Sequence, residues 1–441
     1  MKGKITASSL LFIAIMMMFL MPVGFKNSIE KRASIDSDSN QSTINTTVTG
    51  TVKTTSNANS TVTTTTTLNQ TTTTTSNQTT TTTPTPTTVD TTTTKAQTDK
   101  KPVVNPPSPN GSASVNKPTE NKPAENKPAG TPVSAHGQLS VKGADIVDQK
   151  GNKFQLLGMS THGIGWFPDI ISKSSFKTLR DDWGCNAIRL AMYIEEIYGG
   201  SESCYLADKT RNKNLIINGI EHCLELDMYV IVDWHVLNPG NPTTHTADAK
   251  AFFGEIAKNY GNKPNIIYEL CNEPNGNSVT WANQIKPYCE EVIKEIRKYD
   301  PDAIIVCGTG TWSQDIDKVI GNTVSDKNTV YALHFYADTH RDDLRQRLQS
   351  CYNKGLPVLV TEFGTCDASG NNKYNSSETQ KWFDLMDKLN VGYSNWSLSN
   401  KSETASVFTS GTKLSDIKAG TSQLTESGKL IRAQLRKRAG L

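Results

Sequence analysis

The sequence has a long stretch that lacks the residues from which a hydrophobic core is built. No Phe, Trp or Tyr occurs from Lys26 to Leu139, and only three of the 32 aromatic residues precede that stretch. A segment of this composition cannot bury enough apolar surface to offset the entropy of ordering the chain. We therefore expect a globular domain only in about the last 300 of the 441 residues, which is the size of one large domain.

The sequence also lacks the motifs of several functional classes. No Cys-x-x-Cys pair or Cys/His cluster with zinc spacing is present, so we expect no metal. No GxGxxG or Walker motif is present either, and we expect no nucleotide or other cofactor. Residues 138–441 hold 34 Lys and Arg against 36 Asp and Glu, a net charge of −2. Nucleic-acid binding needs a basic surface, so we expect no nucleic-acid partner.

The first 25 residues have the pattern of an export signal. Lys2 and Lys4 precede an apolar run from Leu10 to Phe25. The run is short for a membrane span of roughly 20 apolar residues, but no small-x-small cleavage site follows it, so an uncleaved N-terminal anchor is the alternative. Both interpretations place the remaining chain outside the cytoplasm, secreted or tethered to the cell surface.

Residues 26–137 are rich in Thr, Asn and Pro. They contain the Thr run 63–67 and a near-repeat of Asn-Lys-Pro at 116–118, 121–123 and 126–128. We expect a disordered linker that acts as a spacer for the domain. Low-complexity sequence without a function is the alternative interpretation.

All eight cysteines lie after residue 184. Export permits disulfides, and an even number of cysteines is compatible with them. Several cysteines, however, sit in apolar runs such as Ala303–Cys307, where buried thiols behave as small hydrophobes. We expect mostly free thiols.

Eight apolar, β-branched runs follow a predicted hairpin over Leu139–Asp148, and amphipathic patterns such as Phe252–Tyr260 separate them. Strands that are continuously apolar and alternate with helices indicate a parallel sheet buried on both faces. Eight such units over residues 138–441 predict a (β/α)8 TIM barrel, with a doubly wound open sheet as the alternative. The runs are Phe154–Met159, Ala187–Met192, Tyr229–Trp234, Ile266–Cys271, Ala303–Cys307, Val330–Phe335, Pro357–Thr361 and Val391–Trp396.

Two carboxylates follow apolar runs directly, Glu273 in the fourth unit and Glu362 in the seventh. In a barrel the active site lies at the carboxyl ends of the strands. Glycoside hydrolysis needs two such groups, one protonated and one ionised. The structural alternative is that each Glu forms a salt bridge with an arginine such as Arg189.

From about Gln138 to its end, the chain resembles the catalytic domain of glycoside hydrolase family 5 cellulases. The resemblance rests on segments that occur in the family's order and at domain-wide spacing. These segments are Ser160–Gly163, Ala187–Tyr193, Val232–His235, Tyr268–Pro274, Ala332–Ala337, Thr361–Gly364 and Asn395–Leu398.

This resemblance implies a retaining endo-β-1,4-glucanase, with Glu273 as general acid/base and Glu362 as nucleophile. Double displacement requires carboxyl groups no more than about 5.5 Å apart. Arg189 is expected to keep the nucleophile ionised. The resemblance also gives supporting roles to other residues of the same subsite, namely Asn272, His235, His334 and Tyr336.

Sugar rings present apolar CH faces, so a glycan cleft needs aromatic platforms. Trp166, Trp312 and Trp396 are the candidates, although a single Trp is more often part of a core. Hydroxyl groups of the sugar are expected to bond to His162, Tyr193, Lys401 and Glu403.

The predicted substrate is cellulose or a soluble β-1,4-glucan, degraded by a monomeric hydrolase. A mannanase, xyloglucanase or lichenase of the same clan would share both Glu residues. A non-catalytic glycan-binding surface protein is the alternative from a different class. The basic residues of the last segment, Arg432, Arg436, Lys437 and Arg438, are expected to form a solvated helix face.

Overall fold

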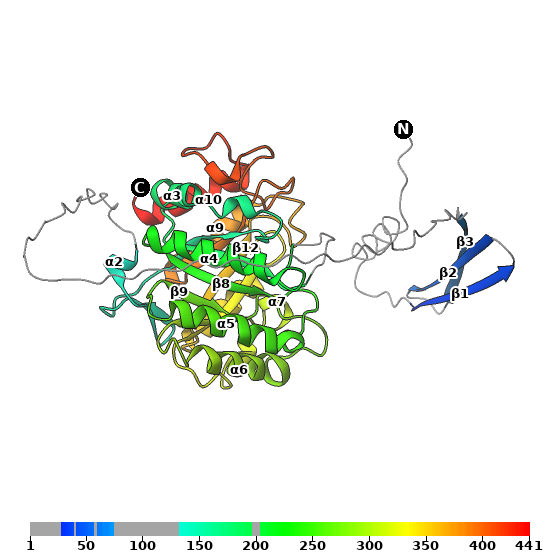
Figure 1. Ribbon diagram of the computed structural model, residues 1–441, viewed down its shortest axis with the longest axis horizontal. Coiled ribbons are helices and arrows are strands. Elements are labelled where there is room, and N and C mark those ends of the chain that lie inside the picture. The colour runs from blue at the N-terminus through cyan, green and yellow to red at the C-terminus, as the bar shows by residue number, and fades with distance from the viewer. Residues whose placement is uncertain (1–27, 39–40, 57–59, 75–131, 196–202) are drawn as a thin grey trace, which may run out of the picture. The chain divides into compact units, whose positions relative to one another are not determined.

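The computed structural model describes residues 28–38, 41–56, 60–74, 132–195 and 203–441. The chain divides into two units, residues 1–116 and 117–441, and each is described by itself (Figure 1). The predicted export signal, residues 1–25, and residues 75–131 of the predicted linker lie outside the described residues. Among the helices that are described, none has the length and apolar character needed to cross a membrane.

The first unit contains a three-stranded antiparallel sheet in the order β1-β2-β3. Its strands are β1 (Ser28–Asp38), β2 (Gln41–Ser56) and β3 (Ser60–Thr74). From their composition we expect these residues to form part of a disordered linker. Their many β-branched Thr residues are compatible with strands. The role of residues 26–137 as a linker stays a prediction.

The first described elements of the second unit are a short helix and the predicted hairpin. These are α2 (Val133–His136) and the antiparallel pair β4 (Ser140–Lys142) and β5 (Asp145–Val147). Gly143 in the connecting turn has a φ of 63°, which favours glycine. The hairpin packs its apolar residues against those of the following strands, in a cluster that includes Leu139, Ile146 and Tyr229.

The main fold is a closed barrel of eight parallel strands, which confirms the predicted (β/α)8 architecture. Each predicted apolar run contributes one strand. The first strand begins at Leu157 rather than at Phe154, because Phe154 and Leu156 are buried beside the hairpin instead. The strands are β6 (Leu157–Thr161), β7 (Ala187–Tyr193), β8 (Tyr229–His235), β9 (Ile266–Glu269), β10 (Ile304–Cys307), β11 (Thr329–Tyr336), β12 (Val358–Gly364) and β13 (Tyr393–Leu398).

Helices surround the strands on the outside of the barrel (Figure 1). Side-chain caps start several of them: Asp208, Asn375 and Thr425 each accept a hydrogen bond from a backbone N–H of the first turn. The helices are α3 (Lys173–Thr178), α4 (Lys209–Glu225), α5 (Thr246–Tyr260), α6 (Lys286–Ile296), α7 (Gly310–Ser313), α8 (Asp342–Asn353), α9 (Ser376–Leu389) and α10 (Glu426–Ala439). Shorter helical turns are η1 (Pro168–Ile170), η2 (Leu179–Trp183), η3 (Pro242–His245), η4 (Trp281–Ile285), η5 (Ile316–Val319) and η6 (Leu414–Asp416).

The last helix, α10, is tied to the barrel by its arginines. Arg432 contacts both carboxylate oxygens of Asp182 in η2, at 2.8 and 2.6 Å, and Arg436 contacts the same side chain at 3.1 Å. Arg438 donates to Oε1 of Gln155 at 2.8 Å. The expectation of a solvated face is wrong for Arg432, whose side chain is only 15% exposed, whereas Lys437 and Arg438 are exposed as expected.

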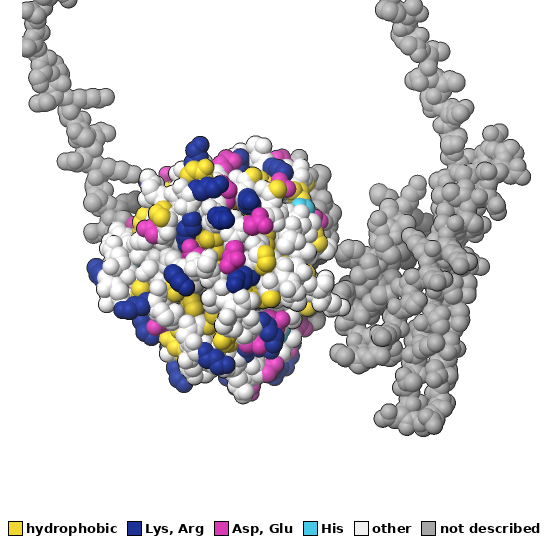
Figure 2. Space-filling model, turned by 90° about the horizontal axis from the view of Figure 1, so that it is seen from below, with side chains coloured by type: hydrophobic (Ala, Val, Ile, Leu, Met, Phe, Trp, Pro, Cys, Tyr) yellow, Lys and Arg dark blue, Asp and Glu magenta, His cyan; other side chains and the backbone are white. Residues whose placement is uncertain are grey.

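All eight cysteines are buried and free, which confirms the expectation of mostly free thiols. On the surface, Figure 2 shows one face of the molecule, where Lys and Arg side chains are interspersed with Asp and Glu. This face carries charge of both signs.

Candidate active site

Arg189 on β7 is the centre of a buried ionic network at the carboxyl ends of the strands. Its Nε and Nη2 lie 2.7 and 3.2 Å from the carboxylate of Glu269, and Nη2 lies 2.9 Å from Asp233. Its Nη1 lies 3.2 Å from Oε2 of Glu362. Arg189, Asp233 and Glu269 are fully buried. A guanidinium group stays charged and can satisfy several carboxylates at once.

Asp233 and Glu269 have no predicted role, although both lie in the segments that carry the family resemblance. They are register partners on β8 and β9. The signal that could have identified them is an acidic residue inside an otherwise apolar strand, because such a charge needs a partner. Burial raises the pKa of Asp233 to about 7, against the opposing effect of Arg189.

Glu273 follows β9 and lies next to His334 on β11. Its Oε1 is 3.0 Å from Nδ1 of His334, and its side chain is 13% exposed. Burial raises the pKa of Glu273 to about 8; Arg189 opposes this shift, and the charges of Asp233 and Glu269 add to it. The carboxyl group of Glu273 therefore holds its proton at neutral pH.

Glu362 on β12 has a different environment. Its Oε1 accepts a hydrogen bond of 3.0 Å from the hydroxyl of Tyr336, and its Oε2 faces Arg189. Burial raises the pKa of Glu362 and the charge of Glu273 adds to this, whereas His334 and Arg189 lower it. Two hydrogen-bond donors thus favour the ionised form of Glu362.

Glu273 and Glu362 face each other closely. One carboxylate oxygen of each and one ring nitrogen of His334 all lie within 4.8 Å of one another. Retaining glycosidases have carboxyl groups about 5–5.5 Å apart, and inverting enzymes about 6.5–9.5 Å. The close approach thus fits direct attack on a sugar better than attack through an intervening water. These three groups already have hydrogen-bond partners among themselves and in Tyr336 and Arg189. We therefore assign no metal ion to them.

Asn272 and His235 form the floor beside Glu273. Nη2 of Arg189 donates to Oδ1 of Asn272 at 2.7 Å, which directs the amide nitrogen of Asn272 toward Nε2 of His235, 3.2 Å away. Nδ1 of His235 lies 2.6 Å from Asp233. Burial lowers the pKa of His235 to about 3, so its ring is neutral. The structure brings both predicted residues into the network.

Aromatic rings line one side of the site. The ring of His235 stacks on Trp396 at 5.4 Å and lies 4.1 Å from the ring of Tyr193, which contacts Trp166 edge-on at 4.7 Å. Trp396 is nearly buried and Trp166 is partly buried. The peptide between Trp396 and Ser397 is cis. Trp166, Tyr193 and Trp396 thus form a continuous wall beside the floor.

Trp312 is separate from this wall. It follows β10, and its backbone N–H donates to the carbonyl of Pro274 at 3.1 Å, directly after Glu273. Its side chain is 47% exposed. Its backbone and those of Thr311 and Ser313 have φ values of 53–55°, in the left-handed region that non-glycine residues rarely adopt. The exposed ring of Trp312 remains a candidate platform.

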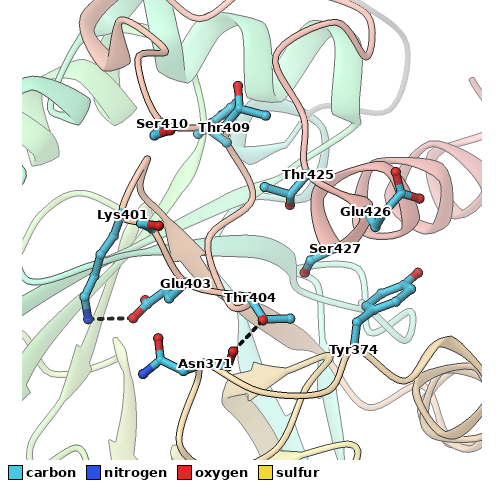
Figure 3. A pocket seen from close by; sticks show the side chains of 12 residues that line it. Asn371, Tyr374, Lys401, Glu403, Thr404, Thr409, Ser410, Thr425, Glu426 and Ser427 are labelled. Atoms are coloured by element: carbon cyan, nitrogen blue, oxygen red, sulfur yellow. Dashed lines mark hydrogen bonds and ion pairs between the residues drawn. The ribbon is translucent and has the colours of Figure 1, made fainter.

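His162 and Glu403 connect the site to a neighbouring pocket. Nε2 of His162 lies 3.9 Å from Oε1 of the buried Glu403, whose Oε2 forms a 2.5 Å ion pair with Lys401. Lys401 and Glu403 also line a pocket of about 590 Å³ together with Asn371 and Tyr374 (Figure 3). Its other lining residues are mostly hydroxyl-bearing, namely Ser402, Thr404, Phe408, Thr409, Ser410, Thr425, Glu426 and Ser427.

Comparisons with known proteins agree with this geometry. The family model described as cellulase, glycosyl hydrolase family 5, matches residues 147–402. Endoglucanase N of Pectobacterium atrosepticum is 44% identical over 312 residues, which cover 70% of this chain and 68% of that protein. An endoglucanase of Clostridium saccharobutylicum is 44% identical over 301 residues, covering 68% of this chain and 65% of the relative.

The fold is also similar to solved structures. The catalytic domain of an endoglucanase from Thermobifida fusca is 38% identical, with a TM-score of 0.66, and the match covers 70% of this chain and all of that domain. A variant of the same domain, solved in complex with cellotetraose, matches equally well. A cellulase catalytic domain described as alkaline cellulase K is 32% identical, with a TM-score of 0.65, over 70% of this chain and 98% of that one.

Proposed function

The chain belongs to glycosyl hydrolase family 5, the cellulases, and we propose that it is an endo-β-1,4-glucanase that works by double displacement through Glu273 and Glu362. The observation that carries the proposal is the close approach of these two carboxyl groups, within 4.8 Å. Glu273 lies beside a neutral histidine and holds its proton, whereas Arg189 and Tyr336 donate to Glu362 and favour its ionised form against the burial that raises its pKa. The relatives named endoglucanases and the cellotetraose complex support a β-glucan as substrate.

In the first step, a carboxylate oxygen of Glu362 attacks the anomeric carbon of the sugar. Glu273 donates its proton to the glycosidic oxygen as the bond to the leaving chain breaks, so the leaving chain departs as an alcohol. The product on the enzyme is a glycosyl ester of Glu362. Arg189 and Tyr336 hold the nucleophile in place before the attack.

In the second step, Glu273 is ionised and accepts a proton from a water molecule. The water oxygen attacks the anomeric carbon, and the ester bond to Glu362 breaks. Two inversions at the same carbon give net retention of configuration. Both Glu residues then return to their starting protonation states.

Substrate binding uses the residues around the two carboxyl groups. We assign Asn272 to a sugar hydroxyl in the reacting subsite, and Trp166, Trp312 and Trp396 to the apolar faces of glucose rings. Further hydroxyl groups of the glucan are bound by His162, Tyr193, Lys401 and Glu403.

We also propose that the enzyme acts outside the cytoplasm as a monomer. The basis is the sequence pattern of residues 1–25 and the Thr-, Asn- and Pro-rich residues 26–137, followed by the catalytic domain at 138–441. Whether the apolar segment is cleaved or anchors the chain would be settled by N-terminal sequencing of the mature protein.

The test is a product profile from reducing-end-labelled cellohexaose, followed by NMR of the first anomer released. We expect internal cleavage and the β-anomer first; the α-anomer first would indicate inversion and contradict the mechanism. Rates on carboxymethylcellulose, lichenan, xyloglucan and mannan test the substrate, and a preference for mannan would overturn it. Binding of β-glucans without hydrolysis would favour the non-catalytic alternative.

A further inference from the structure

A chain of hydrogen bonds runs behind Glu273 through three barrel strands. Oε1 of Glu269 on β9 accepts from the hydroxyl of Thr361 on β12 at 2.7 Å. Oγ1 of Thr361 lies 2.8 Å from Nε2 of His334 on β11, and Nδ1 of His334 lies 3.0 Å from Oε1 of Glu273. Glu269, Thr361 and His334 are buried, so bulk water does not compete for these bonds.

The chemistry of the groups fixes the direction of the first two bonds. Both carboxylate oxygens of Glu269 accept hydrogen bonds from Arg189, so the contact with Thr361 is one more bond that Glu269 accepts. A hydroxyl has a single proton, and that of Thr361 points to Glu269. Oγ1 of Thr361 must therefore accept from His334, which places a proton on Nε2 of its ring.

The direction of the last bond follows from the charge of His334. Burial lowers the pKa of His334 to about 4; Glu362 and Glu269 oppose this shift, and Arg189 adds to it. A neutral ring that has its proton on Nε2 has a bare Nδ1, which can only accept. The donor in the 3.0 Å contact is then the carboxyl group of Glu273.

We propose that Thr361 is a positioning residue: by linking Glu269 to His334 it sets the His334 tautomer that receives the proton of Glu273. This inference rests on the proposed role of Glu273 as general acid/base. Thr361 and Glu269, for which the sequence predicts no role, thereby gain a function. The bare Nδ1 of His334 stabilises the protonated form of Glu273 and disfavours its ionised form. The hydrogen bonds from Glu269 through Thr361 to His334 thus favour the return of a proton to Glu273 in the second step.

Other charges act on the same pair of residues. The titratable and charged groups that face Glu273 or His334 are Arg189, Asp233, His235, Glu269, Tyr336 and Glu362. A Thr361→Val substitution keeps the shape of the side chain and removes none of these charges. It does remove the acceptor for Nε2, so His334 can move its proton to Nδ1 and donate to ionised Glu273.

The test compares Thr361→Val and Thr361→Ser in the full chain. For cellopentaose, we expect the alkaline pKa in the pH profile of kcat/KM to fall by about one pH unit in the Thr361→Val variant. In the Thr361→Ser variant this pKa should stay at the value of the unsubstituted protein. An aryl cellobioside with a 2,4-dinitrophenyl leaving group needs no acid in the first step, so its kcat/KM should stay within about twofold. The proposal would be overturned if the alkaline pKa of the Thr361→Val variant were unchanged. It would also be overturned if kcat/KM fell equally on both substrates.

A spectroscopic measurement reads the tautomer directly. In ¹⁵N-histidine-labelled protein we expect His334, assigned by its loss in a His334→Gln variant, to show a protonated Nε2 and a bare Nδ1. A proton on Nδ1 in the unsubstituted protein would overturn the proposal. If instead Glu273→Ala keeps full activity on cellopentaose, the proposed role of Glu273 itself fails, which is a separate outcome.

Discussion

A carboxylate oxygen of Glu273 and one of Glu362 lie within 4.8 Å of each other at the mouth of the barrel, yet the two residues have different hydrogen-bond partners. Glu273 contacts a neutral histidine, His334, whereas Glu362 contacts two donors, Arg189 and Tyr336. Two chemically identical side chains can thus hold different protonation states at one pH.

Glu273→Ala should lower kcat/KM on cello-oligosaccharides by about 10²–10⁴-fold, because the leaving oxygen loses its proton donor. The loss should be small with a 2,4-dinitrophenyl leaving group. Azide should raise turnover of that substrate and give a β-glycosyl azide, since it replaces water without needing a base. An α-glycosyl azide, or no rescue, would mean that Glu273 has another role.

Glu362→Gln should lower activity by at least about 10⁴-fold on every substrate, because the amide is a poor nucleophile. A 2-fluoro cellobioside should add its sugar mass to the unsubstituted protein in a mass spectrum, and proteolysis should locate the label on Glu362. The variant should stay unlabelled while keeping its circular dichroism spectrum. A label on Glu273 would mean that the two roles are reversed.

The pH profile of kcat/KM should have an alkaline limb near pH 8. The pKa of Glu273 is raised to about 8, and above that pH the residue loses the proton required in the first step. The rate should fall about tenfold for each further pH unit. The acid limb should report protonation of Glu362, whose pKa burial also raises. An alkaline limb below pH 6 would contradict the assignment of Glu273 as the acid.

Arg189→Met should destabilise the fold by about 3–5 kcal/mol at pH 7, because Asp233, Glu269 and Glu362 lose their shared cation. Urea unfolding measures this loss. Burial already raises the pKa values of Asp233 and Glu362, and loss of the cation should raise them further, so the deficit should shrink as the pH falls below about 7. Arg347→Met is the matched control at a more exposed ion pair, and it should cost no more than about 1 kcal/mol.

The eight cysteines give a prediction that is independent of catalysis. Because all of them are buried and free, the native protein should not react with Ellman's reagent. After unfolding in guanidinium without a reductant, eight thiols per chain should react. A smaller number would reveal disulfides.

The barrel could be predicted from the sequence because strands buried on both faces are continuously apolar. The start of the first strand could not be predicted in this way. Phe154 and Leu156 are as buried as strand residues, but they pack beside the hairpin.

Only some residues of the candidate site could be predicted from the sequence. Glu273 and Glu362 could be identified because each stands at the end of an apolar run and within a family motif. The partners of Arg189 could not be identified in the same way, since only closure of the barrel brings β7, β8, β9 and β12 to one point. Asp182, the partner of Arg432, is likewise 250 positions away.

The contacts of α10 have a consequence for how the domain is made. Arg432 and Arg436 are the cations that neutralise Asp182 in η2, and Arg438 reaches Gln155 just before the first barrel strand. Until a ribosome has added these arginines, Asp182 lacks the two cations that pair with it in the folded domain. The pairing of Asp182 and Gln155 with α10 can therefore be completed only after the last helix has been translated.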